Sequence, residues 1–157
     1  MSNKFPVAII GAGAMGTGIA QIAAAAGHPV RIFDSRRGAA ETASEAIRAM
    51  YAKLAGKGKM SPRAADDAGG LLVPAKALAE LADAGLALEA IVENLEEKRK
   101  LFAALEALVS PDCLLATNTS SLAIPDIAVA LQAPQRLTGM HFFNPVPLMD
   151  LVEVVGG

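Results

Sequence analysis

The feature that most constrains the fold of this chain is a glycine-rich turn placed between an apolar run and a helical run. Residues 7–10, Val-Ala-Ile-Ile, predict a short strand buried on both faces, because the run contains no polar residue. Gly-Ala-Gly-Ala-Met-Gly follows at residues 11–16, and the alanine-rich run over residues 15–26 predicts a helix. A strand, a glycine turn and a helix in this order predict the first unit of an α/β sheet.

Each glycine of this turn has its own role in binding a pyrophosphate. Gly11 permits the tight turn, Gly13 lets a phosphate approach the backbone, and Gly16 lets the helix pack closely on the strand. Ala14 and Met15 lie in the first helical turn, where unpaired N–H groups and the positive end of the helix dipole attract phosphate oxygens. Glycine triplets also occur by chance, but the position of this one between strand and helix predicts dinucleotide binding.

The second predicted strand, residues 30–33, is followed by an acidic residue. Asp34 lies about 20 residues beyond the glycine turn, where a carboxylate can accept hydrogen bonds from the ribose hydroxyls of adenosine. Arg36 and Arg37 come next and could attract the 2′-phosphate of NADP. We favour NAD as the cofactor, because Asp34 would repel that phosphate at close range. The alternative is a glycine turn and a capping aspartate in an α/β domain that binds no nucleotide.

Short apolar runs alternate with alanine-rich runs along the rest of the chain. Further strands are predicted at residues 71–73, 88–92, 114–117, 137–143 and 151–155. Further helices are predicted at residues 37–57, 96–108 and 124–131, and another begins at Ser61–Pro62. This alternation predicts an α/β domain over residues 1–157, with a Rossmann-like, doubly wound, mostly parallel sheet and helices on both faces.

The composition excludes several classes of function. The 14 basic and 16 acidic residues give a net charge of −2, which offers no electrostatic footprint for nucleic acid. The single cysteine, Cys113, excludes an intrachain disulfide, and with 2 histidines it leaves too few ligands for a cysteine- or histidine-built metal site. No apolar run reaches the about 18 residues of a membrane span, and the first residues do not resemble a signal peptide. We therefore expect a soluble, cytoplasmic protein that binds no metal.

Polar residues follow several predicted strands, at the edge where parallel α/β sheets bind ligands. Glu93 follows the fourth predicted strand, and Asn118 and Ser120 follow the fifth. One interpretation is that they cap helices and turns; the other is that they hold a substrate oxygen and the nicotinamide end of the cofactor. Lys98, early in a predicted helix, is either a cofactor or phosphate contact or a solvated lysine paired with a nearby glutamate.

The last two predicted strands carry a histidine and a glutamate. His141 precedes Phe-Phe-Asn-Pro, and Glu153 is flanked by Val on both sides, which predicts that its carboxylate is buried or placed by function. If these strands are neighbours, the carboxylate can hold the imidazole tautomer. The ring can then act as a general base that takes a hydroxyl proton while hydride leaves for the nicotinamide. The alternative is a core histidine and an edge-strand glutamate that faces water.

Four segments make the chain resemble a known family: GAGAMGTGIAQ, IVENLEEKRKLF, TNTSSL and GMHFFNPVPLMDLVEVV. Over essentially its whole length the chain resembles the NAD-binding domain of the L-3-hydroxyacyl-CoA dehydrogenases, which include 3-hydroxybutyryl-CoA and phenylacetate-pathway 3-hydroxyadipyl-CoA enzymes. The resemblance implies NAD-dependent oxidation of an L-3-hydroxyacyl-CoA to a 3-ketoacyl-CoA in fatty-acid or aromatic-acid degradation. The alternatives are another β-hydroxyacid dehydrogenase and a non-catalytic NAD-binding protein of the same fold.

The resemblance also implies roles for individual residues. The implied catalytic set is a base, its partner and two groups that touch substrate and nicotinamide: His141, Glu153, Ser120 and Asn144. The implied contacts around NAD and its pocket are Asp34, Glu93, Lys98 and Asn118, and Lys57 falls where a coenzyme A contact is expected. The resemblance further implies a helical domain after residue 157 that completes the site and forms a homodimer. We therefore expect the 157-residue chain to bind NAD but to turn over acyl-CoA poorly.

Overall fold

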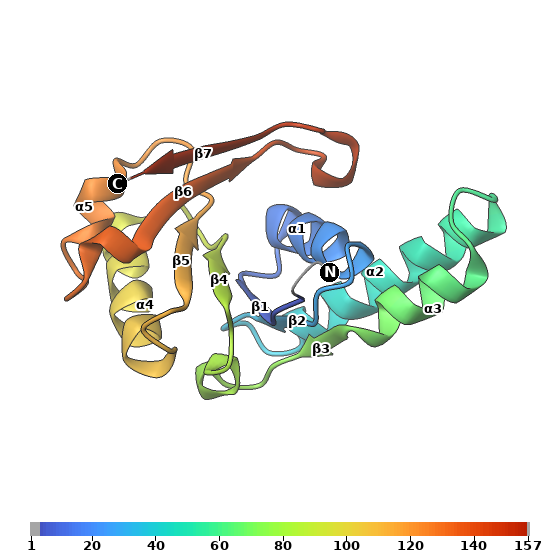
Figure 1. Cartoon of the computed structure of the whole chain (residues 1–157), viewed down its shortest axis with the longest axis horizontal. Helices are drawn as coiled ribbons and strands as arrows, with labels where there is room; N and C mark the ends of the chain where they lie inside the picture. Colours follow the sequence, from blue (N-terminus) through green and yellow to red (C-terminus); the bar gives the residue numbers. More distant parts are fainter. Residues whose placement is uncertain (1–3, 157) are drawn as a thin grey trace.

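The computed structural model describes residues 4–156, in which one sheet is flanked by helices (Figure 1). Its strands are β1 (Val7–Ile10), β2 (Val30–Phe33), β3 (Leu72–Pro74), β4 (Leu86–Glu89), β5 (Leu114–Thr117), β6 (Leu137–Phe142) and β7 (Val152–Gly156). Their order across the sheet is β3-β2-β1-β4-β5-β6-β7. Neighbouring strands pair in parallel except β6 and β7, which are antiparallel. The predicted Rossmann-like, mostly parallel sheet is confirmed.

The helices cover both faces of this sheet. They are α1 (Ala14–Ala25), α2 (Ala39–Gly56), α3 (Pro62–Gly70), α4 (Leu95–Leu108) and α5 (Ile124–Ala128), with short 3₁₀ turns η1 (Leu78–Leu81), η2 (Pro134–Arg136) and η3 (Val146–Leu148). Figure 1 shows α1, α2 and α3 on one side of the strands and α4 and α5 on the other. The predicted helices are present, although α5 is shorter than predicted because it ends at Ala128.

Side chains of β1 alternate between two hydrophobic cores. Val7 and Ile9 pack with residues of α1, α2 and α3, whereas Ala8 and Ile10 pack with residues of α4 and α5. Because helices cover both faces of the sheet, every residue of this central strand is buried, which explains its uninterrupted apolar sequence.

The fourth strand lies earlier in the chain than predicted. β4 ends at Glu89 rather than at Val92. A buried carboxylate is tolerated at this strand end because the ammonium group of Lys98 neutralises it. The prediction that Glu93 follows the strand directly is therefore wrong. Glu93 lies in the loop after the strand, and the Asn94 side chain caps α4 by accepting a hydrogen bond from a backbone N–H in its first turn.

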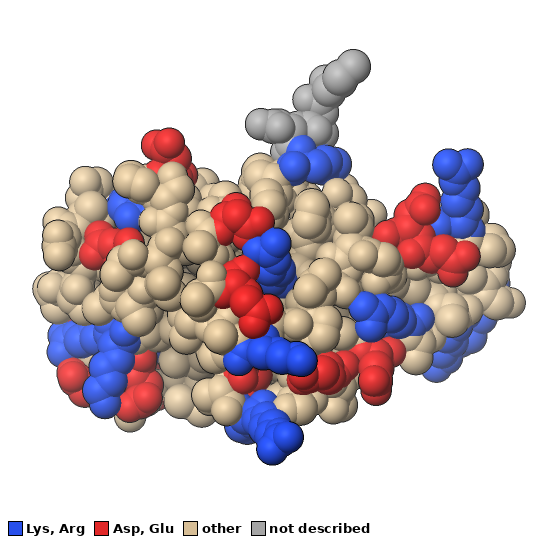
Figure 2. Space-filling model, turned by 90° about the horizontal axis from the view of Figure 1, so that it is seen from below, with Lys and Arg blue, Asp and Glu red and all other residues tan. Residues whose placement is uncertain are grey.

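The described residues 4–156 contain no helix long and apolar enough to cross a membrane. Within this same range, no group of three or more His, Cys, Asp and Glu side chains is arranged to hold a metal ion. Figure 2 shows basic and acidic side chains interspersed on one face of the molecule. Neighbouring charges of opposite sign largely cancel beyond about 10 Å at moderate ionic strength.

Candidate active site

A continuous cleft lies at the carboxyl edge of the sheet, around the point between β1 and β4 where the strand order reverses. A cavity of about 790 Å³ is lined by residues that include Gly13 and Asp34. A second cavity, of about 350 Å³, is lined by residues that include His141. Both cavities are bounded by Met15 and Ile91, so they form one cleft from the end of β2 to the end of β6. Reversal points of this kind are where doubly wound sheets bind their ligands.

The glycine turn has the construction that its sequence predicts. Gly11 has a φ of +107°, and a Cβ there would overlap the carbonyl oxygen of Ala90. A Cβ on Gly16 would overlap the carbonyl oxygen of Gly11, whereas a Cβ on Gly13 would meet nothing within 4 Å. The fold of the turn therefore requires the first and third glycines. The second glycine, N-cap of α1, leaves the helix N-terminus open to a phosphate.

Asp34 is held at the rim of the larger cavity by four hydrogen bonds. Its Oδ2 accepts from the Ala12 N–H at 2.8 Å, and its Oδ1 accepts from the Arg36 N–H at 2.8 Å. The Arg36 guanidinium donates to both oxygens, at 3.0 and 2.9 Å. The guanidinium, with the two backbone donors, lowers the pKa of Asp34 to about 2. The arginine that could attract a 2′-phosphate is thus paired with the aspartate that would repel it.

The Asp34→Asn substitution is expected to weaken NADH binding about ten-fold, the equivalent of one charged hydrogen bond. It should also lower stability in a pH-dependent way. The folded-state pKa of about 2 lies below the usual 3.8, so the carboxylate stabilises the fold fully above about pH 4 and loses this effect as the pH falls toward 2. Melting temperatures measured from pH 2 to 7 should therefore converge for the two proteins at low pH.

The matched control for this prediction is Asp67→Asn. The Asp67 carboxylate is exposed and lies 3.8 Å from Arg63 in a surface ion pair, so its loss should change the melting temperature little at any pH. A difference between wild type and Asp34→Asn that stays constant from pH 7 to pH 2 would contradict the proposed stabilisation.

The structure brings His141 and Glu153 together. In the antiparallel register of β6 and β7 the two residues lie directly opposite each other, with His141 Nδ1 3.2 Å from Glu153 Oε2. A carboxylate can only accept, so Nδ1 donates its proton and the Nε2 lone pair is left for another group. Of the two readings of Glu153, buried or placed by function, the first does not hold: its side chain is 55% exposed, because β7 is the edge strand.

Three further predicted residues line the same cavity as His141. Ser120 and Asn144 are exposed at its wall, after β5 and β6 respectively. Asn118 also lines it, and its Oδ1 accepts the Phe142 N–H at 2.9 Å. This bond ties the loop after β5 to the end of β6, so Asn118 holds the backbone next to the histidine.

A buried ion pair under this cavity was not identified from the sequence. Lys98 Nζ lies 2.6 Å from Glu89 Oε1, and both side chains are at most 1% exposed. The Ile91 N–H and the Thr117 hydroxyl donate to the same carboxylate, each at 2.7 Å. Lys98 is therefore not a solvated lysine, and it also contributes to the cavity wall. A charged residue directly after Leu-Ala-Leu was the available signal in the sequence.

Glu93 is joined to this network although it does not end the strand. The Thr119 hydroxyl donates a hydrogen bond to its carboxylate, and Lys98 Nζ lies 3.9 Å from Glu93 Oε1. Thr119 in turn accepts the Leu122 N–H at 3.1 Å. The loops that follow β4 and β5 are therefore linked by side chains at the wall of the cavity.

Lys57 lies apart from the other predicted site residues. It is exposed at the C-cap of α2, at the tip of the hairpin formed by α2 and α3, which extends away from the sheet (Figure 1).

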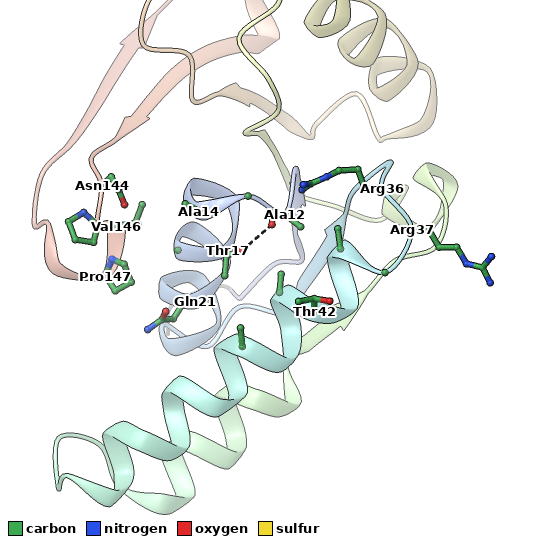
Figure 3. Close-up of a pocket in the computed structure, with 17 residues that line it drawn as sticks. Ala12, Ala14, Thr17, Gln21, Arg36, Arg37, Thr42, Asn144, Val146 and Pro147 are labelled. Carbon is green, nitrogen blue, oxygen red and sulfur yellow. Dashed lines mark hydrogen bonds between the residues drawn. The ribbon is translucent and has the colours of Figure 1, made fainter.

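A third cavity, of about 730 Å³, lies between α1, the first half of α2 and the turn after β6 (Figure 3). Asn144 lines both this cavity and the one that holds His141. The two cavities therefore adjoin at Asn144.

Comparisons with known proteins agree with these features. A family model described as 3-hydroxyacyl-CoA dehydrogenase, NAD binding domain, matches residues 6–157. The 3-hydroxyadipyl-CoA dehydrogenase of Escherichia coli (strain K12) is 43% identical over 157 residues, which are 100% of this chain and 33% of the relative. The 3-hydroxybutyryl-CoA dehydrogenase of Mycobacterium tuberculosis (strain H37Rv) is 41% identical over 150 residues, 95% of this chain and 52% of the relative.

Solved structures agree with the sequence relatives. The crystal structure of 3-hydroxybutyryl-CoA dehydrogenase from Escherichia coli K12 superposes with a TM-score of 0.94 at 42% identity, covering 97% of this chain and 32% of that one. The crystal structure of (S)-3-hydroxybutyryl-CoA dehydrogenase from Ralstonia eutropha gives a TM-score of 0.93 at 32% identity, covering 99% of this chain and 55% of that one. The chain spans from about a third to about half of the length of these relatives.

Proposed function

This chain belongs to the 3-hydroxyacyl-CoA dehydrogenase family as its NAD-binding domain, and from that premise we propose that the whole protein oxidises an L-3-hydroxyacyl-CoA to a 3-ketoacyl-CoA. The observation that carries this proposal is the pair of His141 and Glu153 in the same cleft as the glycine turn. A base and a dinucleotide-binding turn in one cleft are the two parts that hydride transfer from an alcohol needs.

The cofactor is arranged along the cleft in this proposal. The N-terminus of α1 would hold the pyrophosphate, and Asp34 would accept hydrogen bonds from the ribose hydroxyls of adenosine. Ser120, His141 and Asn144, which line the cavity of about 350 Å³, would surround the nicotinamide end. Lys98 and Glu93 form the wall of that cavity near the glycine turn. When bound, NAD supplies the hydride acceptor.

The residues of this chain move and hold the proton. His141 Nε2 takes the proton of the substrate's 3-hydroxyl as the hydride leaves C3, which converts the alcohol to a ketone. Glu153 keeps the Nδ1–H oriented and stabilises the imidazolium that forms. Ser120 and Asn144 donate hydrogen bonds to the substrate oxygen, and Asn118 keeps the end of β6 in position.

The remaining proposals concern the whole protein. The substrate is an acyl-CoA whose coenzyme A contacts Lys57, and a helical domain beyond residue 157 completes the site and forms a homodimer. Leu151, Val154 and Val155 are exposed on and beside the edge strand β7, which supports a covering partner on this side. We also propose that the protein works in the cytoplasm, and its near-neutral charge supports a function without nucleic acid.

We expect the 157-residue chain to bind NADH and to form it from L-3-hydroxybutyryl-CoA at least about 100-fold more slowly than a protein that also carries the helical domain, since imprecise substrate positioning has effects of this size. The reason is that one side of the site is open to water. Fluorescence titration measures binding, and absorbance of NADH measures turnover.

Three outcomes of this assay are informative. Equal turnover by the two proteins would contradict completion of the site by a second domain. Binding of NADH by both proteins without turnover by either would favour the non-catalytic alternative. Equal oxidation of the D enantiomer would contradict the proposed stereochemistry.

A further inference from the structure

A glycine of α1 outside the glycine turn faces the segment that follows β6. Gly18 lies in the second turn of α1 and is buried. A Cβ built on it would lie 2.8 Å from Val146 Cβ, 3.2 Å from Val146 Cγ2 and 3.5 Å from Pro147 Cδ. Real Cβ atoms essentially never come within 3.0 Å of another heavy atom, so α1 and η3 could not lie this close if Gly18 carried a side chain.

Helix propensity does not explain a glycine at this position. Glycine in the interior of a helix costs about 1 kcal/mol relative to alanine. The rest of α1 is rich in alanine, with Gly16 as its other glycine, and a Cβ on Gly16 would overlap the glycine turn. The close approach of Val146 accounts for the glycine at position 18.

The segment that packs on Gly18 is connected to the active site. Val146 is only 3% exposed and packs in the core with α1. Figure 3 shows Asn144, Val146 and Pro147 together next to α1, which carries Thr17 and Gln21, with Thr42 of α2 on the far side of α1. Because Asn144 also lines the cavity of His141, a displacement of Val146 would move one wall of that cavity.

We propose that Gly18 is a positioning residue: its missing side chain seats the turn over residues 144–147 directly on α1. The helix that presents its N-terminus to the pyrophosphate thereby sets the distance from that phosphate site to the wall of the nicotinamide cavity. The identity of the two ligand ends rests on the proposed function. The packing of Val146 on Gly18 is independent of it.

The size of the effect follows from the sterics. To reach the ordinary contact distance of 3.4 Å from 2.8 Å, a methyl group at Gly18 must push Val146 away by about 0.6 Å. The colliding atom is a Cβ, so the backbone has to move with it. We expect this displacement to weaken binding of the nicotinamide end about ten-fold, the equivalent of one hydrogen bond.

The test measures the affinities of wild type and Gly18→Ala for NADH and for ADP-ribose, which lacks the nicotinamide. Wild type should bind NADH more tightly than ADP-ribose, and Gly18→Ala should reduce this preference about ten-fold while ADP-ribose binding stays within about two-fold. The control is Gly70→Ala at the end of α3, where a Cβ meets nothing within 4 Å, and it should leave both affinities unchanged.

Val146→Gly provides the second arm, because it removes the colliding atom. In this background Gly18→Ala should have no further effect on the preference for NADH, whereas independent roles would give additive losses. An unchanged preference in Gly18→Ala would overturn the proposal. So would an equal loss of both ligands, because Gly18 would then serve the fold of α1 as a whole.

A second measurement separates this proposal from the proposed function. The amide resonances of Phe142 and Asn144 in ¹H–¹⁵N spectra of the ligand-free chain should shift in Gly18→Ala and not in Gly70→Ala. Absence of that shift overturns the positioning role. If wild type shows no preference for NADH over ADP-ribose, the proposed nicotinamide site is wrong, while the resonance shifts still decide whether Gly18 positions the turn.

Discussion

Replacing His141 by alanine is expected to lower the rate of NADH formation from L-3-hydroxybutyryl-CoA by the whole protein about 10²- to 10⁴-fold, the range for loss of a general base. The substitution removes the ring whose Nδ1 is held by Glu153 and which lines the cavity of about 350 Å³. It removes no contact of the glycine turn or of Asp34, so NADH binding should change by at most about ten-fold, much less than the rate. The measurements are steady-state absorbance of NADH and a fluorescence titration.

The chain offers a matched control, because it has 2 histidines. His28 lies beyond the C-terminal end of α1, with Nδ1 3.0 Å from the Phe5 carbonyl oxygen and its ring tilted by 60° against that of Phe5. His28→Ala should keep the rate of the wild type. Survival of turnover in His141→Ala would rule out the proposed base, and a similar loss in both variants would point to damage to the fold.

Gly16→Ala is expected to abolish measurable NADH binding and to destabilise the domain. A Cβ at this position overlaps the Gly11 carbonyl oxygen, so either the glycine turn or α1 must move. Overpacking of this kind costs about 3 kcal/mol, which corresponds to about 6–12 °C in melting temperature for a domain of this size. Thermal unfolding followed by circular dichroism and an NADH titration measure the two effects.

Gly13→Ala separates binding from stability within the same turn. A Cβ on Gly13 meets nothing within 4 Å, so the melting temperature should change by less than about 2 °C. The methyl group does occupy the approach of the pyrophosphate, and NADH binding should weaken about ten-fold or more. A wild-type melting temperature for Gly16→Ala, or equal melting temperatures for the two variants, would contradict the assigned roles.

Much of the cofactor half of the cleft was predictable because its determinants are local. The glycine turn, its flanking strand and helix, and Asp34 at the end of β2 lie within one short stretch of chain. Their backbone conformations depend on residue types: Gly11 adopts a φ of +107° that L side chains rarely adopt, and Asp34 accepts bonds from residues of the adjoining turns. The alternation of short apolar runs with alanine-rich runs likewise predicted the mostly parallel sheet.

The buried ion pair was not predictable, because its partners come from different elements. Glu89 ends β4 and Lys98 lies on α4, and neither residue type is expected in a core. The apolar run over residues 90–92 is more strand-like than Glu89, which led to the wrong strand boundary. Only the packing of α4 on the sheet shows that a lysine neutralises the carboxylate and lets the strand end there.

The amino-acid sequence by itself determined the class of fold, the glycine turn and the acidic residue at its rim, because each depends on neighbours along the chain. The tertiary structure alone decided that His141 faces Glu153, that Lys57 lies apart from them and that Val146 rests on Gly18. These contacts depend on strand register and on how closely two elements approach. A shift of one residue in β7 would turn the glutamate to the other face of the sheet.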